Sequence, residues 1–247
     1  MPNWVTNVLR VFGDKAKETL DSLFTQDEFD FNKVIPMPNR LNIESGSKNT
    51  IAMELYLAER FDDIVDEDRT KIGNELAYVN GELKAKGLNP ITLDSAHIKE
   101  LREEHKENLI SLINFGKQNF ENLRDFGHRT WYEWANHHWG TKWNACETNR
   151  TNYNEIIFVT AWAPPYPVIR KLAELYPNVN FEFEFAEEQT GYWSGRIEIE
   201  QGSIVEEMEY PEYSKEAFEK SFELCGGEEF YEFDEESGTY KYKEEED

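Results

Sequence analysis

The chain has 247 residues, of which 39% are hydrophobic and 14% aromatic, enough for a buried core in one large domain or in a domain with an insertion. Its 50 acidic and 26 basic residues give a formal net charge of −24, which disfavours direct contact with nucleic acids and anionic membranes and favours basic proteins as partners. Two cysteines make no disulfide framework, no apolar run reaches the roughly 18 residues of a membrane span, and the first residues lack a signal-peptide pattern, so we expect a cytoplasmic protein.

The first segments predict a strand followed by a helix. Residues 5–12 have the β-branched and alternating pattern of a strand, and Gly13-Asp14 ends it. Residues 15–24 carry apolar side chains at helical spacing. The two prolines within 29–38 exclude a regular helix there, so an extended, packed segment is expected.

Residues 49–127 change to helical spacing and predict a helical insertion. Gly87 to Pro90 separate its second helix from its third, for which Asp94 or Ser95 is the expected N-cap. The predicted helices cover 51–61, 72–83 and 98–120.

Strand patterns return after residue 128. We expect strands at 142–148, 155–162, 181–185, 196–200 and 204–210, and helices at 168–176 and 214–224. Gly202 lies in the turn of a hairpin formed by the last two strands, and Gly226-Gly227 end the last helix.

This order predicts an α+β fold, a split ferredoxin-like β-α-β-β-α-β sandwich with a helical insertion and a C-terminal hairpin plus helix. The ferredoxin-like core takes residues 1–48 and 128–210, the insertion 49–127, and an acidic C-terminal segment 211–247. One face of the sheet is expected to bury Phe181, Phe183, Phe185, Ile197 and Ile199 under helices. The other is expected to show Glu182, Glu184, Glu198 and Glu200 to solvent.

The C-terminal end concentrates the negative charge. Residues 206–247 contain 17 acidic and 4 basic residues, which account for more than half of the net charge. A solvating, partly disordered tail is one interpretation. Seven aromatic residues between 218 and 242 argue instead that much of this end is folded, because a purely solvating tail has few of them.

Several blocks together resemble the YubB-type ferredoxin-like proteins carried by bacteriophages and plasmids. The matching blocks are Asn3 to Asn7, Phe29 to Pro38, Trp139-Gly-Thr-Lys-Trp-Asn-Ala145, Thr160-Ala-Trp-Ala-Pro-Pro165, and Glu187-Glu188 followed by Gly191 and Gly195. The resemblance covers about 1–45 and 128–210 and implies a ferredoxin-like fold and a mobile-element origin. It implies no catalytic residues.

Three local patterns have both a structural and a functional interpretation. Trp139, Lys142, Trp143 and Trp162 either pack together or form an aromatic pocket in which Lys142 meets an anionic ligand. Glu187, Glu188, Glu198 and Glu200 suit acid–base or magnesium chemistry, yet alternating glutamates are expected on the solvent side of a sheet. Nucleophile, Walker and dinucleotide motifs are absent from the sequence.

His137-His138 suggests a metal site, with His128 and Cys146 as further ligands. Adjacent side chains on a regular element point in different directions, and zinc motifs place their histidines with other spacings. The sequence therefore predicts no metal and no cofactor.

We expect a non-enzymatic protein encoded by a phage or plasmid that inhibits a host defence system of the anti-CRISPR or anti-restriction type. Its partner would be a basic, nucleic-acid-handling host protein such as a defence nuclease or CRISPR effector, whose phosphate-binding surface it occupies as a nucleic-acid mimic. The expected partner-binding residues are Glu182, Glu184, Glu198, Glu200, Glu206, Glu207, Glu228, Glu229 and Glu232. The alternatives are a small-ligand-binding or hydrolytic protein that uses the Trp139, Lys142, Trp143 and Trp162 pocket, or a phage assembly role. Both a monomer and a homodimer are compatible with the sequence.

Overall fold

The computed structural model describes residues 3–62 and 66–243. These residues form two compact units: unit 1 comprises residues 1–36 and 135–247, and unit 2 comprises residues 37–134. The sequence predicts these boundaries at 48/49 and 127/128, whereas the units divide at 36/37 and 134/135. The last four residues of the predicted acidic segment 211–247 lie outside the described residues.

Unit 1 is built on a six-stranded antiparallel sheet with the order β4-β5-β1-β6-β7-β8. The strands are β1 (Trp4–Phe12), β4 (Cys146–Asn152), β5 (Glu155–Ala161), β6 (Asn180–Glu187), β7 (Ser194–Glu200) and β8 (Ser203–Glu209). β1 lies in the centre because it pairs with both β5 and β6, although about 140 residues separate it from β5 along the chain. The structure confirms the predicted ferredoxin-like β-α-β-β-α-β order.

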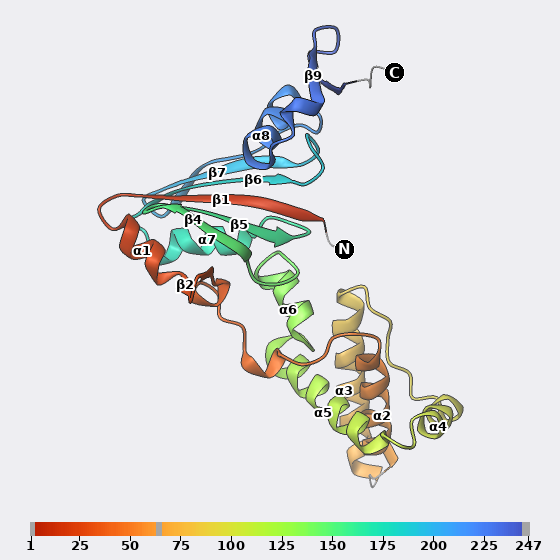
Figure 1. The fold of residues 1–247 in the computed structure, drawn as a ribbon. Helices are drawn as coiled ribbons and strands as arrows, with labels where there is room; N and C mark the ends of the chain where they lie inside the picture. Colours follow the sequence, from red (N-terminus) through yellow and green to blue (C-terminus); the bar gives the residue numbers. More distant parts are fainter. Residues whose placement is uncertain (1–2, 63–65, 244–247) are drawn as a thin grey trace. The chain divides into compact units, whose positions relative to one another are not determined.

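Two helices cover the first face of this sheet, α1 (Ala16–Ser22) and α7 (Tyr166–Leu175) (Figure 1). Alternate residues of β6 point toward them, and Phe181, Phe183 and Phe185 are buried. The ring of Phe185 meets that of Tyr166 on α7 at 5.6 Å with the planes perpendicular. Alternation at a period of two therefore produces the buried face that the sequence predicts.

The second face carries α8 (Lys215–Cys225), on the side of the sheet opposite α1 and α7 (Figure 1). Ser214 caps this helix by accepting a hydrogen bond from the backbone N–H of Ala217. Two contacts fix the helix on the sheet: the Ser221 hydroxyl accepts from the Gly191 N–H, and the Ser194 hydroxyl donates to the Ala217 carbonyl. The described part of the C-terminal segment, up to residue 243, thus belongs to unit 1 and is folded.

A hairpin follows α8. It consists of β9 (Tyr231–Asp234) and β10 (Thr239–Tyr242), preceded by the 3₁₀ turn η3 (Glu228–Phe230). Phe218 and Phe222 of α8 pack against the rings of Tyr231 and Tyr240. These contacts explain why the acidic end is folded: its aromatic residues form a small core of their own.

Unit 2 is helical. Its helices are α2 (Lys48–Asp62), α3 (Asp66–Ala85), α4 (Ser95–Glu104) and α5 (Leu109–Phe126), followed by the first half of α6 (Trp131–His138). α2 and α5 approach very closely at Gly116, where a Cβ atom would lie 1.9 Å from the Ala52 carbonyl oxygen. Met53, Leu57 and Phe120 belong to a buried cluster at this contact.

The predicted single helix over 98–120 is wrong, because the structure has two helices there. α4 ends with His105 as its C-cap, and α5 begins after Asn108. The polar run from Glu103 to Asn108 offers no apolar side chain to bury, so the chain turns instead of continuing. The predicted N-cap Asp94 is confirmed, since its carboxylate accepts from the N–H groups of Ala96 and His97. In the described residues, no helix is both long and apolar enough to cross a membrane.

Candidate functional site

The second face of the sheet carries a ladder of charged side chains that point away from α1 and α7. We call it the charged face. Its members are Arg10 on β1, Glu155 on β5, Glu182 and Glu184 on β6, Arg196 and Glu198 on β7, and Glu206 on β8. They are neighbours because each stands opposite the next in the strand register.

Arg10 lies at the centre of the charged face and binds three carboxylates. Its Nε lies 2.5 Å from Glu155 Oε2, and its Nη1 lies 2.5 Å from Glu182 Oε1 and 2.6 Å from Glu184 Oε2. Burial alone would lower the pKa of Arg10, but the three hydrogen bonds outweigh it and hold the pKa above its ordinary value. A single guanidinium therefore binds all three carboxylates and offsets one of their three negative charges.

Glu184 is the most buried carboxylate of this ladder, with 6% of the residue exposed. Lys220 of α8 forms an ion pair with its second oxygen. Burial by itself would raise the pKa of Glu184, but the hydrogen bonds from Lys220 and Arg10 hold it below its ordinary value. The expectation that Glu184 faces solvent is wrong, because α8 covers it.

Arg196 holds the other end of the ladder. Its Nη1 lies 3.4 Å from Glu198 Oε1, and its Nη2 is paired with Glu206. Six of the nine predicted partner-binding carboxylates are thus engaged in ion pairs within the chain, and four of them, Glu182, Glu184, Glu198 and Glu206, belong to the charged face. A basic partner gains less from these groups than from free carboxylates, because their charge is already compensated.

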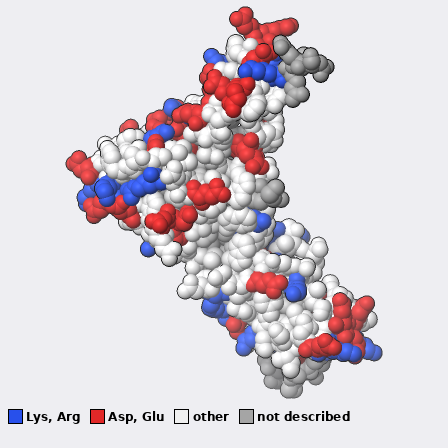
Figure 2. Space-filling view, viewed as in Figure 1, with Lys and Arg blue, Asp and Glu red and all other residues white. Residues whose placement is uncertain are grey.

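The remaining five carboxylates are exposed. Glu207 pairs with Arg170 at 2.5 Å and Glu232 with Lys241 at 3.3 Å. Glu200, Glu228 and Glu229 form no ion pair with any residue that the structure describes. Acidic side chains also gather at the tip of the β9–β10 hairpin (Figure 2). Of the predicted partner-binding carboxylates that form no ion pair among the described residues, two of three therefore lie in the C-terminal segment and one, Glu200, on the sheet.

Exposed aromatic rings accompany these carboxylates. We use the name C-terminal surface for the surface formed by Glu228, Glu229, Phe230, Glu232, Phe233 and Tyr242. Phe230 and Tyr242 stack with centroids 6.4 Å apart and an interplanar angle of 6°, and Phe233 is 45% exposed. The Lys215 ammonium lies 5.6 Å from the Phe233 ring, so the surface already holds one cation beside an aromatic ring.

The predicted aromatic pocket is assembled only in part. Lys142 Nζ lies 4.6 Å from the ring centroids of both Trp143 and Trp162. Trp139 instead packs in the core against Phe31, and its Nε1 donates to the Ile35 carbonyl at 2.9 Å. Three of the four predicted pocket residues, Lys142, Trp143 and Trp162, thus lie together, with the ammonium against both indole rings.

The predicted catalytic pairs of glutamates do not come together as an active site. Glu187 is buried and accepts hydrogen bonds from the Asn3 side chain at 2.7 Å and the Gln189 N–H at 2.9 Å. Glu198 pairs with Arg196, whereas Glu188 and Glu200 are exposed. These bonds give Glu187 the structural task of fixing the turn after β6.

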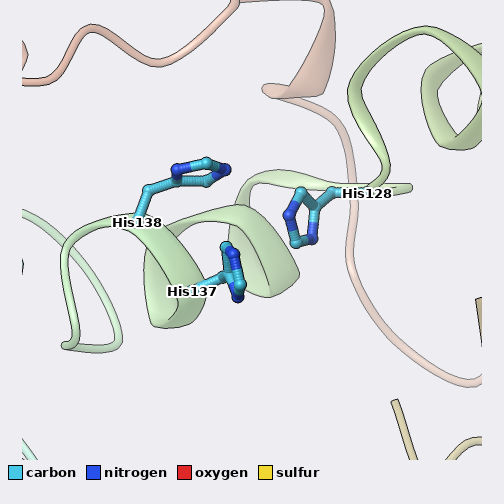
Figure 3. Close-up of side chains that lie close together, drawn as sticks. All are labelled: His128, His137 and His138. Carbon is cyan, nitrogen blue, oxygen red and sulfur yellow. The ribbon is translucent and has the colours of Figure 1, made fainter. Parts of the chain in front are cut away.

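Three histidines lie close together at helix α6 (Figure 3). His137 and His138 are in its last turn, and His128 precedes its first turn. One ring nitrogen of each lies within 4.8 Å of the others. Burial, with a smaller contribution from His137, lowers the pKa of His138 and so favours its neutral imidazole. Cys146, the other ligand considered from the sequence, is not part of this group.

The sequence names these three histidines but predicts no metal site, because it does not predict α6 and so cannot place them together. The helix spans only eight residues, and its sequence Trp-Tyr-Glu-Trp-Ala-Asn-His-His lacks a long apolar period. Gly127 could have signalled the turn, since it ends α5 in the left-handed conformation, with φ of 71°.

The match to a family model supports the fold. Residues 138–243 match the family model described as a ferredoxin-like domain in Api92-like protein. Among solved structures, the crystal structure of the protein api92 from Yersinia pseudotuberculosis is similar to this chain, with 13% identity and a TM-score of 0.40 over 85% of this chain and 99% of that chain. No curated protein matches the chain. The family match confirms the predicted ferredoxin-like domain, while the link to phages and plasmids stays a prediction.

Proposed function

We propose that this protein, whose second half matches a ferredoxin-like domain, binds a basic partner protein through the C-terminal surface and keeps nucleic acid away from it. The observation that supports this most is the contrast between two sets of carboxylates. Those of the charged face are paired within the chain, whereas Glu228 and Glu229 are exposed beside stacked aromatic rings. Arginine and lysine side chains of a partner would find both carboxylates and ring faces there.

A nucleic-acid-handling protein is the class of partner that fits best. The basic groove with which such a protein binds nucleic acid would also attract a protein whose net charge is −24. The sequence resemblance to proteins of phages and plasmids makes a host defence nuclease or CRISPR effector the first partner to test. The protein would inhibit its partner by occupying this groove, and it would catalyse no reaction.

The test is affinity purification of the tagged protein from a bacterial lysate at low and high salt. A variant carrying Glu228→Gln, Glu229→Gln and Glu232→Gln is compared with a control carrying Glu18→Gln, Glu100→Gln and Glu103→Gln. Both remove three exposed charges, so a general effect of net charge would be equal in the two. We expect a basic protein to be retained at low salt by the wild type and the control, and lost from the first variant. Equal retention by both variants would reject the C-terminal surface.

A further inference from the structure

The histidine cluster at α6 has the composition of a metal site. The ring nitrogens of His128, His137 and His138 lie within 4.8 Å of one another. Zinc bonds to imidazole are about 2.0–2.1 Å long and tetrahedral, which requires nitrogens about 3.3 Å apart. Rotation of the His137 side chain, which is exposed, and of the His138 side chain, which is half-buried, would have to close this difference when the ion binds.

The position of His128 is fixed by the chain on both sides of it. Gly127 ends α5, and the Asn122 side chain donates to the Arg129 carbonyl at 2.9 Å. The Arg129 N–H in turn donates to Glu133 Oε2 at 3.0 Å, which ties the turn to the first turn of α6. All three histidines belong to the continuous stretch 128–138, which includes α6.

The adjacency of His137 and His138 does not prevent joint ligation here. Their rings stand 4.8 Å apart and nearly perpendicular, at 81°, and the His128 ring lies next to both (Figure 3). The sequence analysis names His128 as a further ligand but cannot place it relative to this pair. The third ligand, His128, precedes the helix, and its ring nitrogen lies close to those of the other two.

We propose that His128, His137 and His138 bind one divalent transition-metal ion, with Zn²⁺ as the first to test. Imidazole nitrogens suit zinc, copper, nickel and iron, whereas magnesium and calcium prefer oxygen ligands. Three protein ligands leave one position of a tetrahedral ion for water or for a donor group of another molecule. The site is independent of the C-terminal surface.

Isothermal titration calorimetry of the full chain with ZnCl₂ tests the proposal. We expect one ion per chain and a dissociation constant at least about tenfold weaker in His137→Ala. His97→Ala is the matched control, because this partly exposed histidine lies outside the cluster, 3.3 Å from Glu54. It should bind as the wild type does.

His128 is buried, so His128→Asn is measured together with its circular dichroism spectrum to verify that the variant folds. Zn²⁺ should also raise the Tm of the wild type but not that of His137→Ala, because an ion that binds only the native state stabilises it. No binding at about millimolar Zn²⁺, or equal weakening by His97→Ala and His137→Ala, would overturn the site.

Discussion

Arg10→Met is expected to lower the free energy of unfolding by roughly 3 kcal/mol at pH 7. The side chain of Arg10 is 26% exposed and binds Glu155, Glu182 and Glu184. Without the guanidinium, Glu184 keeps only Lys220, and three carboxylates repel one another on adjacent strands. Urea unfolding followed by circular dichroism measures the loss.

The loss should depend on pH. In the wild type the folded-state pKa values of Glu155 and Glu184 are lowered, so these carboxylates stabilise the fold above the ordinary glutamate pKa of about 4.3 and cease to do so as the pH falls through the lowered values. In Arg10→Met the repulsion between the carboxylates raises their folded-state pKa values instead, so protonating them at low pH removes the repulsion. The difference between the two proteins should therefore be large at pH 7 and shrink below about pH 4.

Arg170→Met is the control for this prediction. It removes an arginine from an ion pair with Glu207 that is exposed on both sides, and exposed pairs contribute about 0–1 kcal/mol. A loss in Arg10→Met as small as that in Arg170→Met, or one that does not change with pH, would show that the charged face is not held by Arg10.

Gly116→Ala is expected to destabilise unit 2 by about 1–3 kcal/mol, at the upper end of that range because the obstacle is backbone. The added Cβ would lie 1.9 Å from the Ala52 oxygen and 2.4 Å from the Ala52 carbonyl carbon. α2 and α5 would have to move apart, which opens the cluster around Met53, Leu57 and Phe120. Hydrogen exchange of peptides from α2 and α5 should become faster.

The same substitution at Gly81 should have the opposite sign. Gly81 lies in α3, and a Cβ built there meets nothing within 4 Å. Alanine is favoured over glycine in a helix by about 0.5–1 kcal/mol, so Gly81→Ala should stabilise the protein. If the two variants differ little, helix propensity and not the close approach of α2 to α5 determines the effect at Gly116.

The sequence predicts the sheet well because the alternation of apolar and polar residues is visible within each single strand. The residues of β6 show it most clearly, since Phe181, Phe183 and Phe185 are all buried. What it does not predict is the covering of the second face by α8. Glu184 is identical to Glu182 in its sequence pattern, yet α8 brings Lys220 onto one of them and leaves the other half-exposed. That difference depends on tertiary contacts that no local pattern contains.

The two candidate sites also differ in how far the sequence predicts them. Exposure of Glu228 and Glu229 follows from their place in a short acidic turn, and the sequence includes them among its predicted residues. The histidine cluster instead depends on a turn and a helix of eight residues that together bring His128 close to His137 and His138. Short helices carry a weak periodic signal, so the sequence names His128 as a candidate ligand but does not show that it lies beside the other two.

The most direct test of the proposed function is competition on the partner that the purification identifies. Its dissociation constant for this protein is measured with and without a short nucleic-acid duplex, at two salt concentrations. We predict that the duplex displaces the protein and that affinity falls steeply as salt rises, because both ligands use the same basic surface. Simultaneous binding of the duplex and the protein, with an affinity that salt does not change, would contradict the account.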